Sequence, residues 1–328
     1  DILFDQNCAA NLPIRRTLET LYLNYKGDRT SDEWKALEKY LKKVWFANGI
    51  HHHYSNDKFR PEFSESFFRE AAASVGMDRF PADFDFLCKV IFDPAIYPTR
   101  LNQAAGADML WTSASNYYSN VRQHEAEQFY AAMAAADAGD PCPVSYGLNS
   151  QLVKEEKTGR LYERTWKVGG MYSPAIERIV YWLEKARDVA AEPQKQTLAA
   201  LIDYSRTGYN ILWLQDTVSN VDFVNGFIET YGDPLGYKAS WEANVNFVDS
   251  AACRRTRIIS ENAQWFEDHS PVDPAYKKKV VKGVSAKVIT VAMLGGDCYP
   301  ATPIGINLPN ADWIRKEHGS KSVTIDNI

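Results

Sequence analysis

Apolar residues recur at helical spacing through the first half of this 328-residue chain. The clearest segment begins near Ser31-Asp32, and its apolar residues lie three or four positions apart, so they share one face of a helix. They are Trp34, Leu37, Tyr40, Leu41, Val44 and Trp45. The same pattern predicts helices at 14–23, 65–73 and 121–136, with a polar, His-rich loop at 48–61. The chain must therefore build a largely helical frame.

The pattern changes after residue 143. Segments 151–154 and 161–168 flank Lys157-Thr-Gly159, which predicts a β-hairpin. Ser173-Pro174 opens a helix to about residue 191, and a second helix covers roughly 194–212. The remaining predictions are a strand at 221–231, a helix at 241–269, a buried strand at 287–294 ended by Gly295-Gly296, and a proline-rich loop at 300–310. The predicted fold class is α+β, a mainly helical frame around a small mixed β-core.

Charge and cysteine content exclude several classes of protein. The net charge of −5 offers no basic surface for nucleic acid or an anionic membrane. No run reaches the roughly 20 apolar residues that span a bilayer, so we expect no membrane insertion. Five dispersed cysteines argue against a disulfide framework and a thiolate metal site. They favour a cytoplasmic protein, although an N-terminus without Met leaves the periplasm or cell envelope open.

The histidines do not complete a metal site. His51 and His53 would share one face of an extended loop, but zinc needs a third protein ligand in register. His124-Glu125 resembles the start of a zincin helix, yet Gln128 stands where the second histidine would be. We therefore predict no metal ligand within this chain.

Two segments carry polar residues in unusual places. Glu229 lies in an otherwise apolar strand, where a lone carboxylate is costly to bury without a partner. Asn307 and Asn310 lie in a loop rich in proline and glycine. Each has an ordinary explanation, since Glu229 could form a structural ion pair and asparagine commonly forms turns.

Together these segments resemble the dipeptidyl peptidase III family. The matching stretches are Phe227-Ile-Glu-Thr-Tyr-x-Asp-Pro234 followed by Trp-Glu, and Gly305-Ile-Asn-Leu-Pro-Asn310. Three further stretches agree in the family's order, namely Trp213-Leu-Gln-Asp216, Tyr172-Ser-Pro-Ala-Ile, and Asn48-Gly49 through Asp57-Lys-Phe-x-Pro61. The family's zinc helix, His-Glu-x-x-Gly-His, and its later Glu-rich zinc segment are absent from this sequence.

The resemblance implies a two-lobed zinc exopeptidase that releases dipeptides from oligopeptides with a free N-terminus. The Zn²⁺ ligands are then expected after Ile328, in a C-terminal half that would be this chain's partner. Segment 322–328 has no capping residue or stop signal, as expected for a secondary-structure element that continues past Ile328. By resemblance, 1–249 and 289–328 belong to the lower lobe, and 250–288 is a helical excursion into the upper lobe. We expect this chain alone to be inactive.

The resemblance also implies substrate-binding and catalytic roles for individual residues. Glu229, Asn307 and Asn310 would bind the substrate ammonium group. Ile304 and Gly305 would contact the substrate with their backbone and form a wall of the binding site. Tyr54 would form an aromatic subsite. Tyr231 would be catalytic, donating a hydrogen bond to the carbonyl oxygen as it becomes an oxyanion.

The spacing adds an argument of its own for cutting after two residues. Glu229 and Tyr231 are two apart on the predicted strand, so they would share a face about 6.5–7 Å apart. An extended substrate advances about that far from its amine to the second carbonyl.

A non-catalytic peptide- or glycan-binding protein is the alternative. Nine Trp and eighteen Tyr make carbohydrate stacking conceivable, although most aromatic residues have core-like helical spacing. A substrate with a blocked N-terminus separates the two possibilities, because a glycan or internal-segment binder would ignore the block.

Overall fold

The computed structural model describes residues 1–142, 145–208, 221–281 and 287–328. Its helices are α1 (Ile2–Asn7), α2 (Asn11–Asn24), α3 (Asp32–Ala47), α4 (Glu65–Val75), η1 (Met77–Arg79), α5 (Phe84–Phe92), α6 (Met109–Thr112), α7 (Gln123–Ala136), α8 (Ser173–Val189), α9 (Glu192–Thr207), α10 (Ser250–Glu261), α11 (Ala263–His269), η3 (Pro274–Tyr276) and α12 (Asp312–His318). Its strands are β1 (Tyr118–Ser119), β2 (Ser150–Lys154), β3 (Leu161–Thr165), β4 (Val221–Phe227), β5 (Trp241–Val248), β6 (Lys287–Gly296), β7 (Gly305–Leu308) and β8 (Lys321–Ile325). This arrangement confirms the α+β class.

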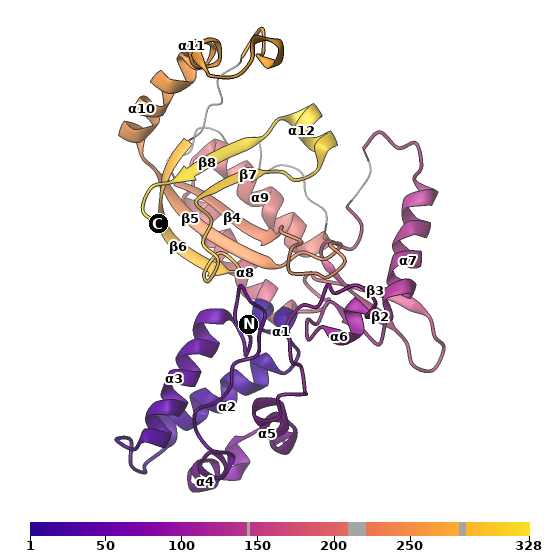
Figure 1. Ribbon diagram of the computed structural model, residues 1–328, viewed down its shortest axis with the longest axis vertical. Coiled ribbons are helices and arrows are strands. Elements are labelled where there is room, and N and C mark those ends of the chain that lie inside the picture. The colour runs from indigo at the N-terminus through magenta and orange to yellow at the C-terminus, as the bar shows by residue number, and fades with distance from the viewer. Residues whose placement is uncertain (143–144, 209–220, 282–286) are drawn as a thin grey trace.

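The helices predicted at 14–23, 31–45 and 65–73 are present as α2, α3 and α4, and α5, which was not predicted, packs with them around one hydrophobic cluster (Figure 1). Trp34 and Leu37 of α3 are buried in it, and burial of such side chains contributes about 1.5–3 kcal/mol each. Ser31 caps α3, because its Oγ accepts a hydrogen bond from the Trp34 amide at 3.3 Å. Helix α3 ends at Ala47, and its C-cap residue Asn48, with a φ of 53°, turns the chain into the His-rich loop.

A five-stranded sheet in the order β4-β5-β6-β8-β7 forms the centre of the molecule (Figure 1). Strands β6 and β8 are parallel, and the other neighbouring pairs are antiparallel, so the sheet is mixed as predicted. Helices α8 and α9 pack on one face, where Ile176 and Ile202 meet Phe227. The predicted hairpin is also confirmed, since Lys154 of β2 pairs with Leu161 of β3.

Helix α1 fastens the start of β5 to the helical frame. The Gln6 side chain donates to the Ala239 carbonyl at 3.0 Å and accepts from the Trp241 amide at 2.9 Å. The Asn7 side chain donates to the Asn48 carbonyl at 3.1 Å. These buried hydrogen bonds fix the position of the 48–54 loop relative to the start of β5.

Segment 241–248 is a strand, so the prediction of a helix over 241–269 is wrong in its first third. The cause is an inverted burial pattern. Strand β5 buries its polar residues Glu242, Asn244 and Asn246, while Trp241 and the other apolar residues on the opposite face are only half-buried. The helix begins at Ser250, after Asp249 caps the Ala251 and Ala252 amides at 2.8 Å.

The strand predicted at 221–231 ends at Phe227. Two backbone bonds continue beyond it, from the Ile228 amide to Ser240 and from the Ser240 amide to Glu229. Residues 231–235 then form turns, so Tyr231 is not on the strand. The same-face spacing argument for Glu229 and Tyr231 therefore does not apply.

The C-terminal region contains more regular structure than predicted. Strand β7 lies inside the predicted loop at 300–310, and α12 and β8 follow it. Strand β6 continues through Gly295-Gly296, the pair expected to end it. The structure describes α9 only as far as Thr207 with its cap at Gly208; residues 209–212 and the Trp213–Asp216 segment lie outside the described residues.

No helix in the described ranges combines the length and apolar character needed to cross a membrane.

Candidate functional site

Glu229 and Asn310 meet at a surface hollow of about 500 Å³. Asn310 follows β7, and its Nδ2 donates to Oε2 of Glu229 at 3.2 Å. The hollow is further lined by Gln103, Thr230, Tyr231, Asp233, Pro234, Leu235 and Gly236. Glu229 is half-buried, and among the described residues its side-chain partner is the Asn310 amide rather than a cation. An ionised carboxylate with an adjacent amide is a suitable receptor for an ammonium group.

Tyr231 lies in the turn after Glu229 and lines the same hollow, with 56% of its surface exposed. Partial burial raises the pKa of its hydroxyl, and the neighbouring Asp297 carboxylate raises the pKa further. The hydroxyl therefore stays protonated at neutral pH and can donate a hydrogen bond.

Asn307, Ile304 and Gly305 lie on or next to β7, the edge strand of the sheet. The exposed Asn307 accepts from Ser322 Oγ at 3.0 Å through its Oδ1, and it does not line the hollow. The Ile304 carbonyl accepts from the Ile325 amide at 2.9 Å. A side chain at Gly305 would meet the Val323 carbonyl oxygen at 3.1 Å.

Tyr54 lies in the His-rich loop with 69% of its surface exposed, and its ring centroid is 4.4 Å from that of His53. That loop meets the loop after β6, since Asn48 Nδ2 donates to the Gly296 carbonyl at 3.5 Å. Phe46 links the two loops through edge contacts with His53 and Tyr299. The fold thus brings the Tyr54 loop to the neighbours of Asp297.

Three residues at this site were missed by the sequence analysis: Glu242, Asp297 and Cys298. Glu242 is 7% exposed, and the Cys298 thiol donates to its Oε2 at 3.4 Å. Burial raises the pKa of Glu242 to about 7; the Cys298 bond opposes this rise, and the charges of Glu229 and Asp297 add to it. The signal that could have found Glu242 is a carboxylate inside alternating strand residues, which the helix assignment obscured.

Asp297 is also buried, and its Oδ2 has no hydrogen-bond partner among the described residues. Its position is fixed by the backbone, because its amide donates to the Trp241 carbonyl at 3.1 Å. Gly296 makes that approach possible, since its φ is +59° and a Cβ there would lie 2.2 Å from the same carbonyl oxygen. Glycine is therefore required at position 296 by this close contact.

The described residues do not fit a zinc site. They contain no group of three or more His, Cys, Asp or Glu side chains that could hold a metal ion. His51 is buried and uses its Nε2 to donate to the Tyr97 carbonyl at 2.8 Å. His52 Nδ1 accepts from the amides of Tyr54 and Ser55 at 3.2 Å. These histidines hold their own loop together.

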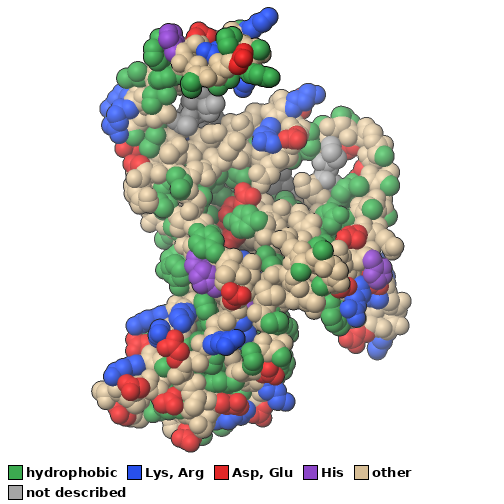
Figure 2. All heavy atoms as spheres, in the orientation of Figure 1, with side chains coloured by type: hydrophobic (Ala, Val, Ile, Leu, Met, Phe, Trp, Pro, Cys, Tyr) green, Lys and Arg blue, Asp and Glu red, His purple; other side chains and the backbone are tan. Residues whose placement is uncertain are grey.

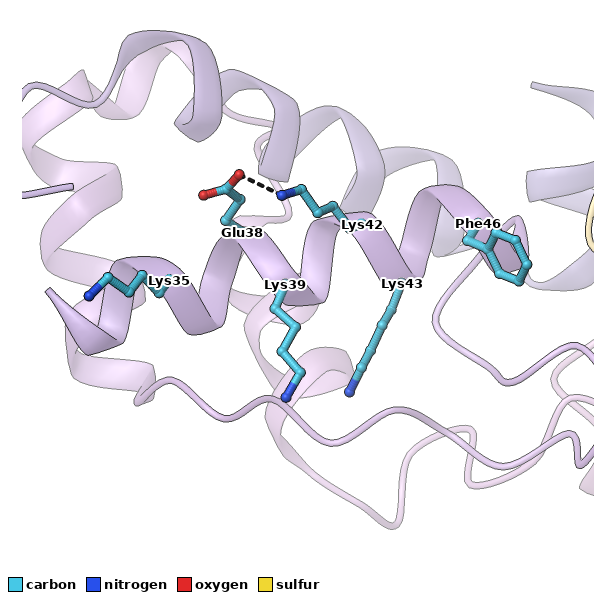
Figure 3. Close-up of a pocket in the computed structure, with 6 residues that line it drawn as sticks. All are labelled: Lys35, Glu38, Lys39, Lys42, Lys43 and Phe46. Atoms are coloured by element: carbon cyan, nitrogen blue, oxygen red, sulfur yellow. Dashed lines mark ion pairs between the residues drawn. The ribbon is translucent and has the colours of Figure 1, made fainter. Parts of the chain in front are cut away.

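A second surface hollow runs along α3 and is lined by lysines (Figure 3). Lys42 pairs with Glu38 at 2.8 Å, as the dashed line in Figure 3 marks. Lys39 and Lys43 both pair with Glu62, at 2.8 and 3.5 Å. Exposed pairs of this kind contribute little and leave a neutralised, solvated helix face.

Comparisons with known proteins agree with this architecture. The sequence profile of peptidase family M49 matches residues 107–328. Human dipeptidyl peptidase 3 is 28% identical over 212 residues, which cover 62% of this chain and 28% of the human protein. Rat dipeptidyl peptidase 3 is 30% identical over 189 residues, which cover 55% of this chain and 25% of the rat protein. The chain belongs to peptidase family M49, which confirms the resemblance derived from its sequence.

Solved structures support the fold over the whole chain. DPP III from Caldithrix abyssi matches with a TM-score of 0.67 at 19% identity, covering 100% of this chain and 52% of that one. Dipeptidyl-peptidase III from Corallococcus sp. strain EGB matches with a TM-score of 0.59 at 17% identity, covering 99% of this chain and 54% of that one. This chain thus spans about half the length of these solved relatives.

Proposed function

We propose that this chain forms the substrate-binding part of a zinc-dependent exopeptidase that releases dipeptides from the free N-terminus of oligopeptides. The observation that carries the proposal is the Glu229–Asn310 pair, which lies at the hollow that Tyr231 also lines. Membership of family M49 and the dipeptidyl peptidase 3 relatives support the same activity.

The substrate ammonium would displace or join the Asn310 amide at Glu229 Oε2. Asn310 could then turn its carbonyl oxygen toward the ammonium, because its amide group can rotate. Asn307 is the more distant contributor: its Oδ1 already accepts from Ser322 but keeps a second lone pair. Ile304, Gly305 and Tyr54 would contact the peptide beyond its amine.

An extended peptide would add to the outer side of β7. Strand β7 pairs with β8 on one side and lies at the edge of the described sheet. Backbone pairing at such an edge gives affinity without requiring a particular sequence. Tyr231 would then donate its hydroxyl hydrogen to the scissile carbonyl as charge develops on the oxygen.

The excursion over residues 250–288 would contact the C-terminal half of the same enzyme. Helices α10 and α11 project from the sheet, and Figure 2 shows hydrophobic side chains on this arm. Ile258, Ile259, Trp265 and Phe266 are all more than half exposed. Exposed apolar groups concentrated on one arm favour a protein partner, and the solved relatives are about twice as long as this chain.

The test uses this chain joined to its C-terminal half. We expect release of dipeptides from a chromogenic dipeptide substrate with a free amine, and no release after N-acetylation. Chelators should abolish the activity. The isolated 328 residues should neither bind stoichiometric zinc nor cleave the substrate. Tight zinc binding by the isolated chain would contradict the proposal, and equal handling of the acetylated substrate would favour a peptide- or glycan-binding protein.

A further inference from the structure

The turn that carries Tyr231 is organised by one buried carboxylate, Asp233, which is 1% exposed. Its Oδ2 accepts from the Tyr237 and Lys238 amides at 2.8 and 2.9 Å, and from the Tyr118 hydroxyl at 2.8 Å. A carboxylate with three donors on one oxygen is strongly held. Asp233 therefore ties the chain after Tyr231 to β1, which carries Tyr118.

The backbone closes a turn on each side of the same residue. The Asp233 amide donates to the Thr230 carbonyl at 3.0 Å, and the Gly236 amide donates to the Asp233 carbonyl at 3.1 Å. Residues 230–236 thus form a double turn centred on Asp233. This double turn supplies most of the residues that line the hollow.

Lys238 is a second buried anchor directly after the double turn, with 0% of its surface exposed. Its Nζ donates to the Tyr130 hydroxyl and to Ser150 Oγ at 3.2 Å, and lies 3.6 Å from the Glu163 carboxylate. Tyr130 and Ser150 in turn both donate to Glu163 Oε1, at 2.8 and 2.7 Å. The double turn is therefore fastened to α7, β2 and β3 by a fully bonded polar network.

Glu229 and Tyr231 are held in different ways. Glu229 is fixed from the sheet, because its carbonyl accepts from the Ser240 amide at 3.0 Å and its side chain accepts from Asn310. The Tyr231 backbone makes no hydrogen bond to the other described residues, so its main chain is placed by the double turn around it, while its hydroxyl interacts with the Asp297 carboxylate. Loosening the double turn should displace Tyr231 more than Glu229.

We propose that Asp233 and Tyr118 are positioning residues that place the Tyr231 hydroxyl for chemistry, with Lys238 fixing the other end of the double turn. This inference rests on the proposed function, since it assumes that Tyr231 acts on the substrate carbonyl. A positioning role through a transition-state donor should affect kcat and leave KM nearly unchanged.

The test is a double-mutant cycle in the complete enzyme with Tyr118→Phe and Tyr231→Phe. Tyr118→Phe removes one hydroxyl and keeps the ring, so it is milder than a change at Lys238, which would leave Glu163 without its cation. We expect Tyr118→Phe to lower kcat about tenfold in the wild-type background and less than twofold in the Tyr231→Phe background. Equal effects in both backgrounds, or an unchanged kcat, would overturn the inference.

Hydrogen exchange supplies a readout that does not depend on activity. Tyr118→Phe should speed exchange of the amides in peptides covering 230–238, relative to the matched control Tyr162→Phe on the half-exposed face of β3. Unchanged exchange in this segment would overturn the inference by itself. A Tyr231→Phe enzyme with full kcat would instead contradict the proposed function, and the exchange result would then decide whether Tyr118 and Asp233 hold the turn.

Discussion

Asn310 donates a hydrogen bond to the Glu229 carboxylate across 3.2 Å, although 81 positions separate the two residues in the chain. The contact joins the turn after β4 to the loop after β7. Strands β4 and β7 are the two edge strands of the sheet. It gives Glu229 a neutral partner, so its charge is available for a cationic ligand.

Glu229→Gln in the complete enzyme should weaken substrates with free N-termini by about 1.5–3 kcal/mol, because a charge-assisted bond is lost. Asn307→Ala and Asn310→Ala should act in the same direction and non-additively with it, since all three would hold one ammonium group. Steady-state kinetics on the single and double variants measure this. Unchanged KM and kcat/KM in Glu229→Gln would mean that Glu229 is only a structural charge.

Tyr231→Phe should lower kcat and kcat/KM together by roughly a hundredfold, while KM stays within a few-fold. The hydroxyl would meet charge that exists only in the transition state, and phenylalanine preserves the ring. Kinetics with melting temperature measured alongside separate this effect from misfolding. A stable variant with undiminished kcat would exclude Tyr231 from the chemistry.

Compared with the wild type, the Glu242→Gln variant should be relatively more stable at pH 8 than at pH 4.5. The folded protein holds the Glu242 pKa at about 7, above its ordinary value of 4.5, so it binds a proton that the unfolded chain loses first. Wild-type stability from this group is complete below pH 4.5 and is lost as pH rises to 7, by roughly 3 kcal/mol. Chemical denaturation at both pH values measures it, with exposed Glu156→Gln as the control. A stability difference between variant and wild type that does not change with pH would contradict the assignment.

His51→Gln should make the protein less sensitive to acid. Burial lowers the His51 pKa from 6.5 to about 4, partly opposed by its bond to the Tyr97 carbonyl. The unfolded chain therefore gains this proton first, and wild-type stability falls by roughly 3 kcal/mol as pH drops from 6.5 to 4. Glutamine can still donate to Tyr97 and cannot be protonated. Urea unfolding across this range, compared with exposed His124→Gln, should show a smaller loss only for His51→Gln.

The sequence by itself determined the helical frame and the family. Apolar spacing in segments such as 31–45 reports which face is buried, because a helix repeats every 3.6 residues whatever surrounds it. The hairpin at 150–165 was predictable for a similar reason, since its turn signal is local. The residues Glu229, Tyr231 and Asn310 were found through their family segments, and the fold brings all three to one hollow.

The tertiary structure alone decided the sheet and the surroundings of the site. Strand β5 buries the polar residues Glu242, Asn244 and Asn246 and leaves its apolar residues partly exposed. A prediction from the local hydrophobic pattern therefore assigns this segment to the wrong type of element. The short edge strand β7 exists because β8 pairs with it, and no local propensity requires that. The charges of Asp297, Glu242 and Glu229 act on Tyr231, and Asp297 is placed there because Gly296 can approach the Trp241 carbonyl. Such contacts depend on strand register and on burial, which only the folded chain fixes.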